Sequence, residues 1–384
     1  MIKSITHPLT CSRKQALFLF LILQSMGYSY AQGPGSWVQK NSLPSDGRGA
    51  PVSFAIGDKA YVGTGLNFNT ASLALIDFWE YDPPTDVWTQ IADYGGGGRG
   101  AAAAFVIGEK GYVLTGADAS ATKKKDIWEY DPSLNTWTQK ADLPGDARNY
   151  STAFAVGNKG YIATGSGNSG DLQDCWQYDP VSDSWTQKAN MSGPSRSSAV
   201  SFGIDGKGYL GTGYIGGYSK SFYAYDTLLN SWTQMSNAGT SSRSDAAAFV
   251  LNGHGFVCGG YTNAGYSDDL LEYDPASDTW TSKASFIGLG KADLTCFSVG
   301  DYGYAGMGYD NQFNQTNGLY QYSLDSTIAT FTTELNAHPQ IVITPNPLTD
   351  GGSISVSTAA NVTATLFSSE GKRISPTHFT KQVS

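Results

Sequence analysis

Histidine, cysteine and charged residues are scarce in this chain. It has 384 residues, of which four are histidine and four are cysteine, and only 15% are charged. The repeated region described below contains a single histidine, His254, which argues against a copper centre because such centres depend on imidazole ligands. We therefore predict no metal site and no cofactor.

Motifs typical of hydrolases and of nucleotide-binding proteins are also missing. No Gly-x-Ser-x-Gly turn presents a nucleophilic serine, and no glycine-rich loop followed by a helix is available to hold a phosphate. The cysteines do not form a disulfide framework, because Cys175, Cys258 and Cys296 are an odd number at different strand positions of different repeats. We expect all three to be small, half-buried hydrophobic residues.

Long apolar runs are lacking as well. The run at residues 16–23 (ALFLFLIL) is too short to span a membrane, and it lies between three basic residues and a small-x-small sequence that ends at Ala31. Residues 1–31 are therefore predicted to be a signal peptide, and the protein is expected to be secreted or displayed at the cell surface. Because this leader holds three basic and no acidic residues, its removal changes the formal net charge from −9 to −12, which argues against a nucleic-acid partner.

The most informative feature of the sequence is a repeat. Glycine (46 residues) and aromatic residues (13%) are abundant, as in β-rich proteins with many tight turns. The segment at residues 127–139, IWEYDPSLNTWTQ, recurs in near-copies along the chain. Its second tryptophan returns at intervals of 51, 49, 48, 47 and 48 residues, in the series Trp37, Trp88, Trp137, Trp185, Trp232 and Trp280. A repeat of this length is typical of a four-stranded propeller blade.

One unit can be divided into four strands. We expect strand a at residues 99–107, a turn at 108–111, strand b at 112–116, strand c at 126–130 and strand d at 137–140. The Asp-Pro-x-x-Asn turn between c and d combines a proline that fixes φ with an asparagine that tolerates left-handed geometry. Alternation in strand c places Trp128 and Tyr130 on one face, where with Trp137 they should fill the space between neighbouring blades.

These units resemble the kelch family. The resemblance rests on an arginine near the start of strand a, a hydrophobic-Gly-x-Gly-Tyr hairpin, a Thr-Gly or Gly-x-Gly end to strand b, and Asp-x-Trp-x-Tyr-Asp-Pro before the repeated tryptophan. It implies an all-β fold over residues 35–323, a six-bladed kelch-type β-propeller. Trp37 belongs to a strand d without a preceding blade, and residues 291–322 supply strands a, b and c without a following one. The N-terminal strand should therefore close the propeller.

The repeat ends at residue 323. Residues 324–340 read as a polar linker, and residues 341–384 as a partial small β unit that resembles the C-terminal sorting domain of type IX secretion, through its Thr-Pro-Asn-Pro start and its Glu370-Gly371-Lys372 turn. The resemblance implies the export machinery as a partner. A small adhesive β module is the alternative for this segment.

The candidate site is the mouth formed by the strand a starts and the loops from b to c. One basic residue per blade lies at a strand a start, and the equivalent arginines contact ligands in some kelch proteins: Arg48, Arg99, Arg148, Arg196, Arg243 and Lys291. A positive ring would suit carboxylates or polar hydroxyl-rich ligands. Alternatively, these residues pair with carboxylates of the loops.

The b-to-c loops carry aromatic residues beside Asn and Asp, the combination that binds the apolar faces and polar edges of sugars. The ligand-binding candidates among them are Tyr214, Tyr261, Tyr309 and Asn311. The same residue types also populate ordinary surface loops, so the sequence leaves both interpretations open.

Asp245 and Asp293 depart from the repeat, because the other blades have Ala, Tyr or Ser two residues after the basic position. Alternation along the strand predicts that they point the same way as their basic neighbours. Two close carboxylates could divide into an acid and a base, or could be neutralised by Arg243 and Lys291.

Three functions follow as hypotheses. The first is a secreted, monomeric, non-catalytic propeller that binds a glycan or a protein through its mouth. The second is a sugar mutarotase or epimerase of the N-acetylneuraminate epimerase kind, with Asp245 and Asp293 as catalytic residues; it is based on resemblance of fold, which does not determine function. The third is a structural surface or adhesion module.

Overall fold

The computed structural model describes residues 34–324, together with short strands outside this range. Residues 34–324 form one compact unit built from strands and turns. In the other unit, β1 (Leu17–Phe18), β36 (Leu366–Ser368) and β37 (Arg373–Ile374) form one small sheet, and β34 (Gln340–Thr344) pairs with β35 (Ser353–Ser357). The signal peptide, the linker and the sorting domain predicted from the sequence otherwise lie outside the described residues. Within the described part of the chain, no helix has the length and apolarity needed to cross a membrane.

Residues 34–324 contain six antiparallel sheets of four strands each. The first sheet is β3 (Val52–Ile56), β4 (Lys59–Gly63), β5 (Phe78–Asp82) and β6 (Val87–Ile91); the second is β7 (Ala103–Ile107), β8 (Lys110–Leu114), β9 (Ile127–Asp131) and β10 (Thr136–Lys140); the third is β12 (Thr152–Val156), β13 (Lys159–Ala163), β16 (Cys175–Asp179) and β17 (Ser184–Lys188). The fourth is β18 (Val200–Ile204), β19 (Lys207–Gly211), β20 (Phe222–Asp226) and β21 (Ser231–Met235); the fifth is β23 (Ala247–Leu251), β24 (His254–Cys258), β27 (Leu270–Asp274) and β28 (Thr279–Ser282). The sixth is β30 (Thr295–Val299), β31 (Tyr302–Gly306), β33 (Leu319–Ser323) and, from the start of the unit, β2 (Ser36–Lys40).

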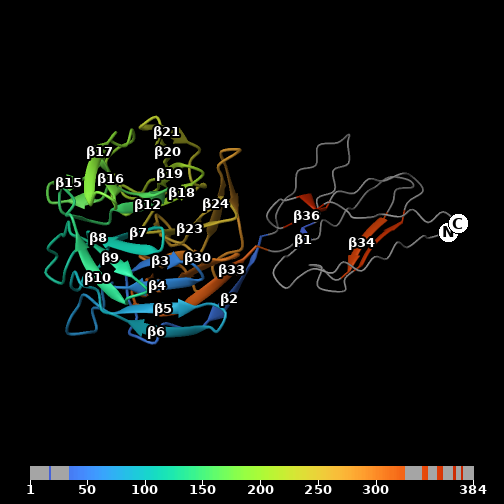
Figure 1. Cartoon of the computed structure of the whole chain (residues 1–384), viewed down its shortest axis with the longest axis horizontal. Helices are drawn as coiled ribbons and strands as arrows, with labels where there is room; N and C mark the ends of the chain where they lie inside the picture. Colours follow the sequence, from blue (N-terminus) through green and yellow to red (C-terminus); the bar gives the residue numbers. More distant parts are fainter. Residues whose placement is uncertain are drawn as a thin grey trace. The chain divides into compact units, whose positions relative to one another are not determined.

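The six sheets are arranged around a common axis. Their first strands, β3, β7, β12, β18, β23 and β30, lie innermost, each beside the next, and β30 lies beside β3. Figure 1 shows these strands near the middle of the unit and the fourth strands, such as β6, β10 and β17, at its periphery. The N-terminal β2 pairs with β33, with Trp37 opposite Tyr322.

Short ribbons extend three of the loops at one end of the axis. β11 (Arg148–Asn149) pairs with β14 (Ser166–Gly167), which pairs with β15 (Gly170–Asp171); β22 (Arg243–Ser244), β25 (Tyr261–Thr262) and β26 (Gly265–Tyr266) repeat this arrangement in the fifth unit. In the sixth unit, β29 (Lys291–Ala292) pairs with β32 (Tyr309–Asp310). These ribbons bring the strand a starts and the b-to-c loops together at one mouth.

The strand boundaries of the second sheet differ from those predicted. Its first strand begins at Ala103 rather than at residue 99, because Ala101 has a φ of 53° and this left-handed conformation interrupts an extended strand. Its second strand covers Lys110–Leu114, because Thr115 is also left-handed, with a φ of 62°. The turn between the two strands is correspondingly shorter than expected.

The repeated aromatic residues pack between neighbouring sheets, as predicted. Tyr130 is buried against Phe54 and Tyr61 of the preceding sheet, and Trp128 and Trp137 cover the same cluster. The turn prediction is also confirmed, since Asn135 has a φ of 52°. Its Oδ1 accepts hydrogen bonds from the Tyr130 hydroxyl (3.0 Å) and from the backbone N–H of Ala92 in the preceding unit (2.9 Å). The turn therefore joins two sheets as well as two strands.

Cys175, Cys258 and Cys296 are free thiols, the first two buried and the third half-buried. This agrees with the prediction of small hydrophobic residues rather than a disulfide framework.

Candidate functional site

The centre of the mouth is formed by six residues with left-handed backbone, one from each unit, which we call the axial ring. Their φ values lie between 49° and 56°, and the residues are Ala50, Ala101, Tyr150, Ser198, Asp245 and Asp293. The N–H of each donates to the carbonyl oxygen of the ring residue before it over 2.8–3.0 Å, and the N–H of Ala50 donates to the carbonyl of Asp293. The hydrogen bonds thus form a closed cycle that links all six units.

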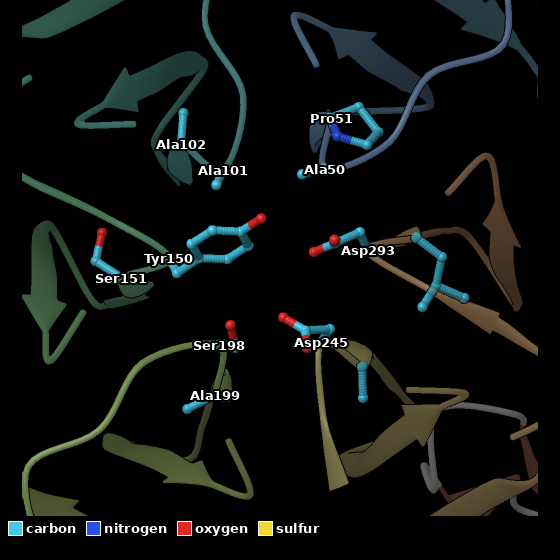
Figure 2. Close-up of a pocket in the computed structure, with 12 residues that line it drawn as sticks. Ala50, Pro51, Ala101, Ala102, Tyr150, Ser151, Ser198, Ala199, Asp245 and Asp293 are labelled. Atoms are coloured by element: carbon cyan, nitrogen blue, oxygen red, sulfur yellow. The ribbon is translucent and has the colours of Figure 1, made fainter. Parts of the chain in front are cut away.

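The axial ring surrounds a small cavity of about 100 Å³. Figure 2 shows the side chains of Tyr150, Ser198, Asp245 and Asp293 directed from the ring towards its centre. The remaining lining is mostly small and apolar, from alanine residues, Pro51 and Leu294. All the polar side chains at the centre of the mouth therefore come from the third to sixth units.

Asp245 and Asp293 form a close pair of carboxyl groups in this cavity. Burial raises the pKa of Asp245, and burial together with the charge of Asp245 raises the pKa of Asp293 well above its usual range. The charge of Asp293, then burial, raises the pKa of Tyr150. Ser244 Oγ donates to Asp245 Oδ2 over 2.5 Å. Within residues 34–324, neither carboxyl forms an ion pair with a lysine or an arginine.

The predicted alignment of these acids with their basic neighbours is wrong. Arg243 extends into its own unit and pairs with Asp269, and Lys291 Nζ donates to Thr316 Oγ1 over 2.9 Å. Asp245 and Asp293 are turned towards the axis instead, because their left-handed φ values of 56° and 52° break the alternation of an extended strand. Neutralisation of the carboxyl pair by Arg243 and Lys291 is therefore not observed.

The basic residues at the strand a starts are buried in the interior, not displayed in the mouth. The buried set is Arg48, Arg99, Arg148, Arg196, Arg243 and Lys291. In four units the guanidinium holds an aspartate at the start of the third strand, in the pairs Arg48–Asp77, Arg99–Asp126, Arg148–Asp174 and Arg243–Asp269. Arg148, for example, lies 2.6 Å and 2.7 Å from the two carboxyl oxygens of Asp174 and donates to the Thr164 carbonyl over 3.0 Å.

These pairs decide the role of the arginines. Burial is the largest single influence on the four aspartates and opposes their ionisation, but the hydrogen bonds and the charge of the arginine, together with further hydrogen-bond donors, outweigh it and lower their pKa values. The guanidinium groups have almost no free surface, and their unpaired donors, Nε of Arg48 and Nε of Arg243, are buried away from the mouth surface. We assign them a structural role, that of fixing the loops of the mouth, which matches the alternative raised by the sequence.

Aromatic side chains line part of the mouth, and we call the series Tyr214, Tyr218, Tyr261, Tyr266 and Phe313 the aromatic arc. Successive ring centroids in this order are 6.4, 5.7, 5.0 and 5.7 Å apart. The arc begins in the fourth unit and ends in the sixth. Its two ends are the most accessible, since 44% of Tyr214 and 70% of Phe313 are exposed. Burial is the main cause of a raised pKa of Tyr266, to which the charges of Asp293 and Asp245 also contribute.

The remaining ligand-binding candidates of the b-to-c loops are Tyr309 and Asn311, and the same loops also carry Asp118 and Asp310. Tyr309 stacks on Phe68 of the first unit, with centroids 6.2 Å apart, and Asn311 is exposed. Asp118 and Asp310 instead accept backbone N–H groups of their own loops, so that they stabilise loop conformation. The structure therefore brings Tyr214, Tyr261, Tyr309, Asn311, Asp245 and Asp293 to one mouth and separates the six basic residues from it.

A second cavity, which we call the apolar groove, adjoins the axial cavity. It has a volume of about 190 Å³ and shares Ala101 and Tyr150 with the axial ring. Its other walls are Leu66, Phe68 and Leu73 of the first unit and a short alanine-rich loop of the second. Within the described residues no group of three or more His, Cys, Asp or Glu side chains is arranged to hold a metal ion.

Sequence reasoning missed Tyr150 and Ser198 as lining residues. Both occupy the repeat position that drew attention to Asp245 and Asp293, and among the six units tyrosine occurs there once and aspartate twice. The signal was therefore present. The sequence predicts an extended strand at this position, and an extended strand does not indicate that the side chain turns towards the axis.

Comparisons with known proteins agree with this architecture. Residues 52–242 match a family model described as the KLHDC2/KLHL20/DRC7 Kelch-repeats domain, and residues 242–286 match the Kelch motif. Among solved structures, the chain is similar to one titled "Structure of YjhT", with 15% sequence identity and a TM-score of 0.62, over 75% of this chain and 98% of that one. At this identity the likeness is one of fold. No curated protein sequence matches the chain.

Proposed function

We propose that this protein is a secreted binding module that takes a glycan at the mouth. The proposal starts from its kelch β-propeller fold, which the matches to kelch-repeat models over residues 52–286 support. A kelch propeller supports a binding or scaffold role in general. The observation that carries the proposal is the aromatic arc, a row of rings with exposed ends around a small polar cavity. Rings of this kind stack on the apolar faces of sugars, while Asn311 can bond their hydroxyl groups.

The electrostatics of the mouth select among glycans. Its arginines are buried, four of them paired with aspartates, while its centre carries the Asp245 and Asp293 carboxyls. An acidic sugar would meet negative groups and no free guanidinium. The ligand is therefore a neutral or amino-bearing glycan rather than an acidic one.

A glycan array that compares neutral, amino-bearing and acidic sugars tests this proposal. The double variant Tyr214→Ala/Tyr261→Ala should weaken binding of the best neutral ligand at least about tenfold, which corresponds to about 1.4 kcal/mol. Leu228→Ala is the matched control, because Leu228 is 94% exposed in the turn after β20, at the opposite end of the axis. Absence of any neutral ligand, or equal binding by the double variant, would overturn the proposal and leave a protein ligand or an adhesion module as the function.

Export and architecture are part of the same proposal. A signal peptide at residues 1–31 and a sorting domain at residues 341–384 would place a monomeric, six-bladed propeller outside the cell. Support for six blades and for closure by β2 comes from the six sheets and from the cycle of backbone hydrogen bonds. Fractionation of expressing cells, with N-terminal sequencing of the product, tests the export step: an intracellular product that retains residues 1–31 would contradict it.

A sugar mutarotase or epimerase is the second candidate. The specific observation in its favour is the Asp245–Asp293 pair, since two enclosed carboxyls that repel each other can act as an acid and a base. Anomerisation of neutral and sialic acid sugars should then be faster with the protein than without it, as followed by NMR. If Asp245→Asn and Asp293→Asn leave such a rate unchanged, the pair is not catalytic.

A further inference from the structure

The strongest unexplained feature of the mouth is a carboxyl group without a partner. Asp293 points into the axial cavity (Figure 2), and within residues 34–324 its side chain receives no hydrogen bond and no ion pair. Burial is the main cause of its raised pKa, and the half-buried carboxyl is shielded from much of the bulk water. An enclosed carboxylate without a partner is costly, and a cation in the cavity would remove that cost.

The cavity is suited to a small donor group. Its volume of about 100 Å³ corresponds to about three water molecules, at about 30 Å³ each. Besides the two carboxyls it offers the hydroxyl groups of Tyr150 and Ser198 as further acceptors (Figure 2). A primary ammonium group carries three donors and one positive charge, which these acceptors can satisfy together.

The apolar groove supplies the second half of the site. It meets the axial cavity at Tyr150 and Ala101 and is walled by Leu66, Phe68 and Leu73 on one side and by alanine residues on the other, with Asp118 and Asn149 as its polar lining. Phe68 is 61% exposed, so the groove opens to solvent while most of its lining is apolar. An aliphatic or aromatic stem that leaves the axial cavity would enter a groove that excludes water from it.

We infer that the mouth binds a primary amine carried on an apolar stem, with the ammonium group between Asp245 and Asp293 and the stem along the apolar groove. The groove lies between the first and the second units, away from the aromatic arc of the fourth to sixth units, and only the carboxyl pair at the centre of the mouth is common to both proposals. The inference goes beyond the glycan proposal, because a stem in the groove requires none of the rings of the arc.

Calorimetric titration of the full chain with n-hexylamine, n-hexanol and n-hexanoate tests the inference. We expect hexylamine to bind at least about tenfold more tightly than hexanol, and hexanoate to bind most weakly, because only the amine complements the carboxyl pair. Methylamine, which lacks a stem, should bind more weakly than hexylamine. Equal affinities for hexylamine and hexanol, or no detectable binding of hexylamine at millimolar concentration, would overturn it.

Variants separate the two halves of the site and the two proposals. Asp293→Asn and Asp245→Asn should each reduce hexylamine affinity at least about tenfold. Phe68→Ala should weaken hexylamine and leave methylamine unchanged. Thermal unfolding of each variant verifies that it is folded. Tyr214→Ala should leave hexylamine binding intact. If the wild-type protein binds hexylamine but no neutral glycan, only the aromatic-arc proposal is refuted; if it binds a neutral glycan but not hexylamine, only this inference is refuted.

Discussion

At the scale of single residues, the fourth unit carries a buried arginine without its carboxylate. Ser221 stands where the first, second, third and fifth units have an aspartate, and its hydroxyl accepts from Arg196 over 3.0 Å. Burial lowers the pKa of Arg196 to about 10, whereas the pKa of Arg99 is raised, because burial is outweighed there by the hydrogen bond to Asp126 and by neighbouring charges. Arg196 is instead held by the Thr212 carbonyl, 2.8 Å away, and by the ring of Tyr223.

Ser221→Asp should therefore stabilise the protein. We expect the free energy of unfolding to rise by about 1–3 kcal/mol, because a charged hydrogen-bonding partner would be supplied to a guanidinium that is already desolvated and fixed in place. Chemical denaturation of the variant against wild type measures the change. Ser221→Asn is the matched control, with a similar shape and no charge; if it gives the same stabilisation, the charge contributes nothing.

His254 gives the fifth unit a dependence on pH. Its Nδ1 lies 3.1 Å from Glu272 Oε1, and Lys283 Nζ lies 2.8 Å from the other carboxyl oxygen of this buried glutamate. The close contact with Glu272 raises the pKa of His254 although burial opposes it. The folded pKa is therefore above the unfolded value of about 6.5, so the stabilisation is complete below about pH 6.5 and is lost as the pH rises through the folded pKa.

Comparison of His254→Gln with wild type tests this pH dependence. The stability difference between the two proteins should be largest at about pH 5.5 and should shrink by about pH 8.5, as the histidine loses its proton in both the folded and the unfolded states. Urea unfolding at a series of pH values measures it. A difference that is constant, or that grows with pH, would show that the histidine contributes by packing alone.

The residue scale also shows what the sequence could and could not reveal. The repeated arginines and their Asp-x-Trp partners were both visible, and Trp128 Nε1 in fact donates to the same Asp126 carboxyl that Arg99 holds. The sequence did not show that the arginine and the Asp-x-Trp motif meet in the interior. Pairing of residues 26–29 positions apart depends on the path of two loops, and loop geometry is set by tertiary contacts.

At the scale of strands, β2 connects the first and last parts of the compact unit. Trp37 packs against Phe286 and Tyr322, with centroids 5.0 Å away in both cases, and its Nε1 donates to the Ala284 carbonyl over 2.9 Å. Val38, the next residue, is 58% exposed. Substitutions at Trp37 and Val38 therefore distinguish the contribution of buried packing to stability from that of strand propensity.

Trp37→Ala should lower the free energy of unfolding by about 3–5 kcal/mol, as is typical for loss of a buried tryptophan. Val38→Ala in the same strand should change it by no more than about 0.5 kcal/mol, because its side chain faces solvent. Denaturant titrations of both variants measure this contrast. If Trp37→Ala and Val38→Ala change the free energy of unfolding by similar amounts, the burial of Trp37 is not what holds β2 in its sheet.

Strands with a strong alternating pattern were predictable, and the axial ring was not. The repeat located the second unit's strands to within a few residues, since aromatic and glycine positions recur in every copy. Ala, Tyr and Ser have no intrinsic preference for φ near 50°, so their left-handed conformation arises from the cyclic hydrogen bonds between units. No local pattern records a constraint that exists only when all the units are assembled.

At the scale of the whole molecule, the hydrogen-bonded cycle should make the six units open together. A second set of bonds reinforces the first, since Gly65 N–H donates to the Arg99 carbonyl of the next unit, and the same contact recurs around the axis up to Gly308 and Arg48. We therefore expect the amides of the axial ring to exchange with solvent at closely similar free energies, within about 1 kcal/mol of one another.

A local defect tests this cooperativity. Trp137→Ala in the second unit should lower the protection of all six axial-ring amides by similar amounts, as measured by native-state hydrogen exchange. In an open repeat array each unit contacts only its neighbours, and the loss would be confined to nearby amides. Loss of protection limited to Ala101 and its two neighbours would therefore contradict a closed cycle.

The backbone cycle of the axial ring allows the six side chains at its centre to be substituted. The cycle is made by backbone N–H and carbonyl groups alone, so it does not depend on the six side chains that meet at its centre, which are now Ala, Ala, Tyr, Ser, Asp and Asp. Stability and ligand preference are thereby separable traits. Substitutions at these six positions can diversify the chemistry of the axis in evolution, or in a designed library, while the scaffold around them is retained.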